Sequence, residues 1–317
     1  SIVATHAQQI SKRLSFGVDY RRIKNQNFYF SNLENFSRVR MGNLFNTKFY
    51  TSYYSPERKY EMVASYIWNR SKNVEFGGIS SDSSFNSQSG RNKLNNSSVN
   101  FTDGLGTLAQ NQFKLTQYFR PGGLSNDSIL DASLSQFDQQ FFISSALKNE
   151  RVEFEDKSPD SLNYGFSILP FKDSSYHRSI ENEFGYMKTI GNYSISSSII
   201  HDFSSIYQNT IKESFQNLYF NTKAVIKLNK INFRPQAKIG VLGYNAGDYS
   251  IDGILSTSFN NFNVIGGFSI QKVEPTFMQN EFRSNAVQWQ NDFSKISINQ
   301  LHGSVSTNLI NHSLKFD

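Results

Sequence analysis

The sequence predicts an all-β protein in which antiparallel strands form a transmembrane β-barrel of about 14 or more strands. Apolar and polar residues alternate along most of the chain, in segments of about 9–11 residues or more, the length that a tilted strand needs to cross a bilayer. Short turns separate many of these segments. No stretch approaches the roughly 18 consecutive apolar residues of a membrane helix.

The composition agrees with this fold class. Aromatic residues make up 15% of the 317 residues, but only 38% are hydrophobic and the mean hydropathy is -0.49. A barrel shows lipid only one half of each strand, so a polar average does not indicate a soluble protein. The chain has no Cys, which excludes disulfides and thiolate chemistry. Its net charge of +6 is spread along the strands, and we therefore predict no nucleic-acid partner.

The first expected strands alternate in this way. Within 36–54, one face carries Val39, Phe45 and Phe49, and the other carries Asn46 and Lys48. The other strands before the midpoint of the chain are expected near 9–22, 59–76, 110–120 and 136–155.

Later strands repeat the alternation. The apolar set of 231–244 includes Ile231, Phe233 and Ile239, whereas Arg234 and Lys238 lie in the polar set. The remaining strands are expected near 176–188, 192–202, 215–229, 249–260, 262–273, 282–292 and 295–309.

The connections alternate between short and long, as expected of an outer-membrane barrel with short turns at one rim and long loops at the other. We expect tight turns at 55–58, 189–192, 229–230, 260–261 and 293–294. Longer connections are expected at 23–35, 77–109, 156–175, 203–214 and 273–281, while 121–134 is too long for its rim and 245–248 too short. A soluble sandwich would have no reason to sort loops by length.

Charge decides which face meets lipid. Placing Arg or Lys against lipid at the midplane costs about 2–4 kcal/mol, so the charged set should point into the barrel. The candidate pore-lining residues are Arg13, Arg38, Arg40, Lys48, Lys114, Arg120, Lys223, Lys227, Arg234, Lys238, Glu181 and Glu183. Asp19, Glu61 and Asp252 join the two glutamates as the expected inward anions. Because cations exceed anions, an open lumen is expected to prefer anions mildly. Alternatively, the charges pair across strands and plug it.

No catalytic, cofactor or metal site is predicted, and the chain is not expected to be an enzyme. The five His residues lack metal-ligand spacing. Glu181 and Glu183 share a face, but they read better as solvated lumen residues than as an acid/base pair. His302 and Ser304 also share a face, a pattern that is common by chance.

Three segments resemble the putative porin family of Bacteroidota outer membranes. They are the stretch that ends in 36–45, the segment 177–186 and the segment 280–293. The resemblance spans most of the chain and lies in the residue pattern of the strands, not in an invariant motif. It implies an integral outer-membrane β-barrel, a single domain over residues 1–317, and it carries over no functional residue. Family members are usually longer, and our count of strands is odd, so part of the barrel is expected to be missing from the chain.

The resulting functional prediction is a porin-like channel for passive diffusion of small hydrophilic solutes, surrounded by outer-membrane lipid. The alternative is a non-conducting barrel that docks other outer-membrane proteins. A third reading, a soluble carbohydrate-binding β-sandwich, also accounts for the aromatic residues and the alternation.

Overall fold

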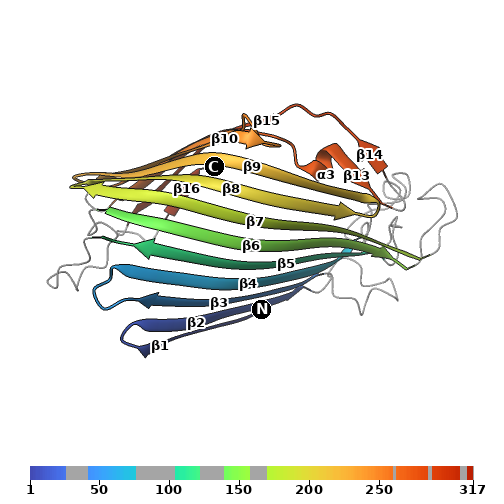
Figure 1. The fold of residues 1–317 in the computed structure, drawn as a ribbon, viewed down its shortest axis with the longest axis horizontal. Coiled ribbons are helices and arrows are strands. Elements are labelled where there is room, and N and C mark those ends of the chain that lie inside the picture. Colours follow the sequence, from blue (N-terminus) through green and yellow to red (C-terminus); the bar gives the residue numbers. More distant parts are fainter. Residues whose placement is uncertain are drawn as a thin grey trace.

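The computed structural model describes residues 1–25, 42–75, 104–121, 139–157, 170–259, 262–284, 288–307 and 313–316. Most of them form one 14-stranded antiparallel sheet in which successive strands pair in chain order, except that β12 pairs with β15 (Figure 1). The strands are β1 (Ile2–Ser11), β2 (Leu14–Asn25), β3 (Gly42–Tyr54), β4 (Tyr60–Glu75), β5 (Gly104–Phe119), β6 (Gln139–Asp156), β7 (Phe171–Ile190), β8 (Tyr193–Gln208), β9 (Ile211–Leu228), β10 (Ile231–Gly243), β11 (Tyr249–Phe259), β12 (Phe262–Val273), β15 (Ile296–Thr307) and β16 (Ser313–Phe316).

The connection from β12 to β15 carries the other regular elements. The single-turn helix α3 (Phe277–Asn280) is followed by a small hairpin of β13 (Glu281–Arg283) and β14 (Gln288–Gln290). No helix among the described residues has the length and apolar character needed to cross a bilayer.

Tight turns close the hairpins at one rim of the sheet. The β7–β8 turn contains Gly191 at φ 56°, and the β9–β10 turn contains Asn229 at φ 49°. Glycine and asparagine accept this left-handed conformation at the lowest steric cost, which is why the chain reverses there. We call this rim, at the left of Figure 1, the short-turn rim, and the opposite one the long-loop rim.

Polar side chains are buried and large apolar side chains are exposed, which is the reverse of a soluble protein. Gln140 and Gln208 are each 1% exposed, whereas Phe184 and Ile199 on the other face are 56% and 53% exposed. A large apolar surface of this kind on a sheet requires lipid or another protein to cover it. The polar face is the one opposite this apolar surface, so the two faces of the sheet differ as the alternation predicts.

A soluble β-sandwich is wrong for this chain. It needs two sheets that pack through apolar faces. The described strands instead form one large sheet with an exposed apolar face, apart from the β13–β14 hairpin. Among the described strands β1 and β16 do not pair with each other, so this sheet is curled but not closed.

Several expected features differ from the structure. The tight turn expected at 293–294 is wrong, because 291–295 joins β14 of the small hairpin to β15 of the large sheet. The connection at 203–214 is not a long loop, because β8 continues to Gln208 and β9 begins at Ile211, with Asn209 at φ 36° in a two-residue turn. The outer ends of these strands are rich in serine and carry no clear apolar alternation. The strand expected at 282–292 is also wrong, because that segment forms the β13–β14 hairpin, in which Phe282 stacks on Trp289 at 4.5 Å.

The count of strands changes accordingly. The sheet gains β1 and β16, which the alternation does not show, and loses the strand expected at 282–292. The short connection at 245–248 is confirmed, while the expected turn at 260–261 lies outside the described residues.

Candidate functional site

The register of the strands determines which side chains share a face, because directly paired residues point the same way. One row runs through Ser144, Glu183, Ile200 and Tyr219 on four successive strands. Asn221 lies next to this row on the same face. Of these five residues, all but Ile200 are polar. We call this side of the sheet the lumen face and the opposite side the outer face.

Most of the sequence-predicted pore-lining residues fall on the lumen face by register. Lys114 pairs with Ala146 in the row that contains Glu181, and Lys223 pairs with Gln236 in a row that contains Asp252. By the same test, the residues on this face are Lys48, Lys114, Arg120, Lys223, Lys227, Arg234, Lys238, Glu181 and Glu183.

Three candidates do not belong to that set. Arg13 lies in the β1–β2 turn at 12–13, because β2 begins only at Leu14, and so it does not line a strand wall. Arg38 and Arg40 lie outside the described residues.

Several acidic residues of the lumen face were missed at the sequence level. Asp202 lies directly opposite Glu181, and Glu150 lies opposite His177, with 3.1 Å between a carboxylate oxygen and Nδ1. Glu213 lies opposite Ile206 on the same face. The sequence signal that could have found these acids is their spacing of two, four or more even steps from lumen-face serines such as Ser198. Apolar residues give no such reference there, because they become fewer toward the long-loop rim.

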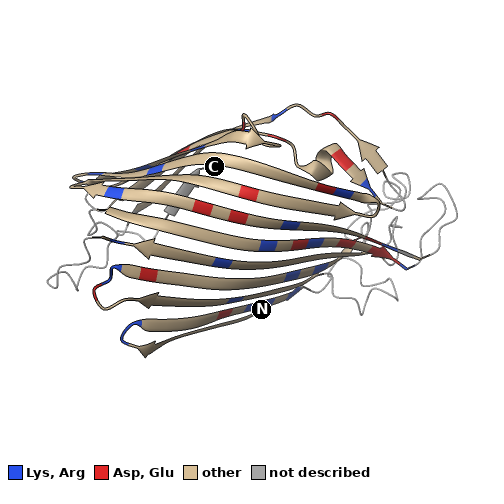
Figure 2. Ribbon diagram, in the orientation of Figure 1, with Lys and Arg blue, Asp and Glu red and all other residues tan. Residues whose placement is uncertain are grey.

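Most acids and most cations occupy different parts of the lumen face, except that Glu61 lies at the short-turn rim and Arg21 and Lys148 lie in the other half. Figure 2 shows Lys, Arg, Asp and Glu on most strands of the sheet. In the half of each strand toward the long-loop rim, the lumen face carries the acids Glu75, Glu150, Asp156, Asp173, Asp202 and Glu213. Toward the short-turn rim it carries the cations Lys114, Arg120, Lys223, Lys227 and Arg234, whereas Lys48, Lys238, Glu181 and Glu183 lie near the strand centres.

Arg120 is held in place by its neighbours at the short-turn rim. Its side chain is 3% exposed, and its guanidinium donates to Glu61 at 2.6 Å and to Gln140 at 3.1 Å. A buried cation requires such partners, because desolvation would otherwise cost several kcal/mol. Arg120 therefore fixes the ends of β4, β5 and β6 to one another.

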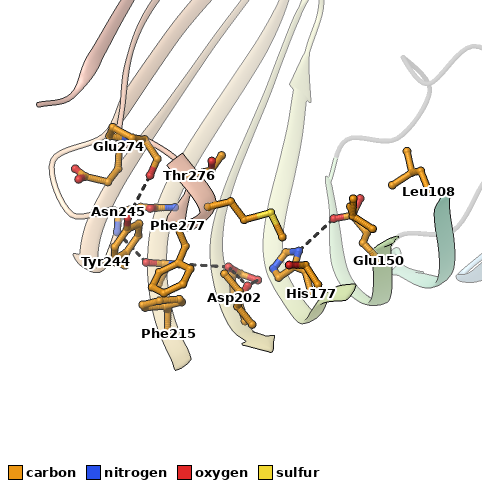
Figure 3. Close-up of a pocket in the computed structure, with 17 residues that line it drawn as sticks. Leu108, Glu150, His177, Asp202, Phe215, Tyr244, Asn245, Glu274, Thr276 and Phe277 are labelled. Carbon is orange, nitrogen blue, oxygen red and sulfur yellow. Dashed lines mark hydrogen bonds and ion pairs between the residues drawn. The ribbon is translucent and has the colours of Figure 1, made fainter. Parts of the chain in front are cut away.

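A cavity of about 460 Å³ opens on the lumen face toward the long-loop rim. Strands β5 to β9 form its wall, and the β12–β15 connection closes one side with Thr276, Phe277 and Met278. Figure 3 shows Phe277 beside Phe215, whose ring centroids are 5.4 Å apart. The connection therefore packs against the lumen face instead of extending away from the rim.

The residues of the β12–β15 connection explain why it bends toward the lumen face. Pro275 precedes a single helical turn in which the Gln279 side chain accepts the Thr276 backbone N–H at 2.8 Å. The Tyr244 hydroxyl donates to the Pro275 carbonyl at 3.2 Å, and the Arg283 N–H donates to Gln208 at 3.2 Å. We call the described residues of 274–295 the inner strap.

Lys295 and Asp248 fasten the far end of the inner strap. Lys295 forms ion pairs with Asp248 and, at 3.2 Å, with Glu274, and it donates to the Ala246 carbonyl at 2.9 Å. Asp248 also accepts the Glu274 N–H at 2.9 Å. Both ends of the strap thus meet at one carboxylate that is only 8% exposed.

The strap contacts give a pH prediction. Desolvation acts to lower the pKa of Lys295, but hydrogen bonds from its ammonium to Asp248 and Glu274 outweigh it and raise the pKa above the ordinary value. Because folding raises the pKa of a cation, its stabilising contribution is complete below about pH 10.5 and disappears as the pH rises through the folded pKa.

We therefore expect the pKa of Lys295 to lie above that of exposed lysines. NMR of ¹³C-methylated lysines, assigned with Lys295→Arg, measures it. A pKa of Lys295 no higher than the ordinary lysine value would contradict the strap contacts.

The described residues hold no group of three or more His, Asp or Glu that could bind a metal ion. His302 and Ser304 do share the lumen face, opposite Gly267 and Ile265. Neither makes a hydrogen bond to the other among the described contacts.

Comparisons with known proteins agree with this architecture. The sequence model of a family described as putative porin matches residues 1–317, which is the whole chain. No curated protein matches the chain.

Solved structures of outer-membrane receptors share the fold. The siderophore receptor PirA from Acinetobacter baumannii has a TM-score of 0.58 at 9% identity, with 96% of this chain and 47% of that chain covered. A mutant of the ferric enterobactin receptor PfeA from Pseudomonas aeruginosa has a TM-score of 0.59 at 9% identity, with coverages of 97% and 48%. The chain spans slightly less than half the length of these receptors, and at this identity the likeness concerns the fold alone.

Proposed function

The chain belongs to the putative porin family and is an integral outer-membrane protein, and from that premise we propose that it conducts small hydrophilic solutes by passive diffusion. The observation that carries the proposal is the lumen face, which has polar or charged side chains on every strand from β2 to β12. A lumen of this kind solvates a permeating solute along its whole path, and no described residue group suggests a catalytic step. The Bacteroidota origin that the resemblance implies stays a prediction.

A mild preference for anions forms part of the proposal. Lys48, Lys114, Lys223, Lys227, Arg234 and Lys238 make no ion pair with any described residue, so their charge is available to the lumen. Two acids near the long-loop rim are already compensated, because Glu150 pairs with Lys148 at 3.0 Å and Glu274 pairs with Lys295. Asp202 and Glu213 oppose the preference, which is why we expect it to be mild.

Reversal potentials in a planar bilayer under a salt gradient test this selectivity. Lys114 and Lys223 line the same lumen-face cavity as Glu183. The double variant Lys114→Gln/Lys223→Gln should therefore shift the selectivity toward cations, because it leaves Glu183 without neighbouring positive charge.

The control is Lys188→Gln, which removes a cation from the outer face of β7. It should leave the reversal potential unchanged. A wild-type preference for cations, or equal shifts in both variants, would refute the assignment of these lysines to the conduction path.

A second function is favoured by the inner strap, which occupies part of the lumen. A strap that stays in place would make the protein a non-conducting barrel that docks other outer-membrane proteins. Absence of single-channel currents together with stable co-purification of fixed partners in mild detergent would select this function over diffusion.

A further inference from the structure

The outer face changes from apolar to cationic near the long-loop rim. On β2 the outward residues Phe16 and Val18 are followed by Tyr20 and then by Arg22 and Lys24. On β4 the same succession occurs, with Tyr66 and Trp68 followed by Arg70 and Lys72. Charges on this face cannot be explained by a watery lumen.

The register brings these four cations together. Phe45 of β3 pairs with Arg22 on one side and with Arg70 on the other. One step closer to the rim, Asn43 pairs with Lys24 and Lys72 in the same way. Neighbouring strands are about 4.8 Å apart and alternate residues about 6.8 Å apart, so the four side chains start from the corners of a patch of roughly 10 by 7 Å. We call Arg22, Lys24, Arg70 and Lys72 the cation patch.

An aromatic cluster lies directly below the cation patch. The Phe45 ring meets Tyr20 at 5.5 Å and Trp68 at 4.9 Å, both edge to face. Trp68 is 42% exposed on the outer face. Tyr and Trp rings concentrate where hydrocarbon meets the headgroups of a bilayer. The patch therefore lies at headgroup level, at the rim where barrels carry their long extracellular loops.

Arg22, Arg70 and Lys72 have no acidic neighbour at the outward positions of the described strands that carry them. The outward residues of β2, β3 and β4 include no Asp or Glu among the described residues, because Asp19, Glu61 and Glu75 point to the lumen face. Arg22, Arg70 and Lys72 make no ion pair with a described residue.

Outer-face cations two strands away behave differently. Arg151 and Lys172 both form an ion pair with Glu153, and the Lys172–Glu153 distance is 2.8 Å, so one acid offsets part of the charge of that cluster. The cation patch differs from this cluster because no acid stands at an outward position of β2, β3 or β4 among the described residues.

We propose that the cation patch binds a membrane lipid whose headgroup carries phosphomonoester groups, in the leaflet at the long-loop rim. Guanidinium groups bind phosphate oxygens bidentately, and lysines add point charges around them. The apolar surface of Phe16, Val18 and Phe49 below the patch would lie along the acyl chains of the same lipid. Such a lipid would cover the outer face of β2–β4 independently of whether the lumen conducts.

Binding of phosphatidic acid tests the proposal, with phosphatidylcholine as the reference lipid. The detergent-solubilised full chain is titrated with each lipid, and native mass spectrometry counts the lipid bound. Each cation near anionic lipid is worth about fivefold in affinity, so Arg22→Gln/Arg70→Gln should weaken phosphatidic acid binding by roughly thirtyfold. Binding of phosphatidylcholine should hardly change.

The matched control removes two cations at the opposite rim, in Lys188→Gln/Lys230→Gln, and should bind phosphatidic acid as the wild type does. Lys24→Gln/Lys72→Gln provides a second patch variant if the first does not fold. Equal affinity of wild type and both patch variants, or an equal loss in the control, would overturn the patch as the binding site. Displacement of the lipid by inorganic phosphate at similar concentration would overturn the assignment to a lipid.

Discussion

Leu255→Arg is expected to lower the free energy of unfolding by about 2–4 kcal/mol, the cost of an arginine on the lipid side near the midplane. Leu255 lies at the centre of β11 on the outer face, opposite Phe233 and Gly266, and is 41% exposed. An arginine there has no acid within its rows and must be taken out of water by the bilayer. Urea unfolding of the protein in lipid vesicles measures the loss.

The adjacent residue provides the control for this prediction. Ile254 is also an exposed aliphatic residue, at 45%, but it lies on the lumen face opposite Arg234. Ile254→Arg places the new charge near Asp252, two residues away on the same face, so repulsion and attraction largely offset each other. We expect a loss below about 1 kcal/mol. Equal losses in the two variants would mean that the outer face does not meet lipid.

Asp248→Ala is expected to detach the inner strap from the lumen face. The substitution removes one of the partners of the Lys295 ammonium and the acceptor of the Glu274 N–H. A hydrogen bond to a charged group contributes about 1.5–3 kcal/mol. One such bond corresponds to a roughly ten- to hundredfold rise in the detached population. Faster hydrogen exchange across 274–284 reports this change whether or not the protein conducts.

If the diffusion proposal holds, the same variant should also increase single-channel conductance, because Phe277 would leave its place beside Phe215. Lys295→Met should have a smaller effect, since Asp248 still accepts the Glu274 N–H at 2.9 Å. Asp292→Ala changes the same charge at an exposed site in the connection and should change neither measurement. Unaltered hydrogen exchange in Asp248→Ala would show that this carboxylate does not hold the strap.

The alternation of apolar and polar residues predicted the outward and inward faces of a strand where one face meets lipid. The strand expected at 231–244 matches β10, with Ile231 and Phe233 on the outer face and Arg234 on the lumen face, as predicted. The alternation failed where strands extend beyond the lipid. At the end of β8, Gln208 is only 1% exposed and accepts the Arg283 N–H of the inner strap at 3.2 Å. A buried position there can therefore hold a polar side chain, so the lumen side and the outer side do not differ in polarity.

The charges of the candidate site were only partly predictable. Lys114 and Lys223 stand out because they alternate with apolar neighbours, whereas Asp202 and Glu213 sit in serine-rich stretches without that contrast. The direction of the 274–295 connection was not predictable either. It depends on partners such as Gln208 and Tyr244, which are distant in the sequence.

By itself, the sequence determined the period of two and therefore the β fold, its antiparallel hairpins and the face that meets lipid, because a bilayer penalises each misplaced charge locally. Only the tertiary structure decided which charges share a row, such as Glu181 with Asp202 and Arg22 with Arg70 across Phe45. It also decided that a connection near the C-terminal end packs against the lumen face. These contacts depend on strand register and on the curl of the whole sheet, which no single segment encodes.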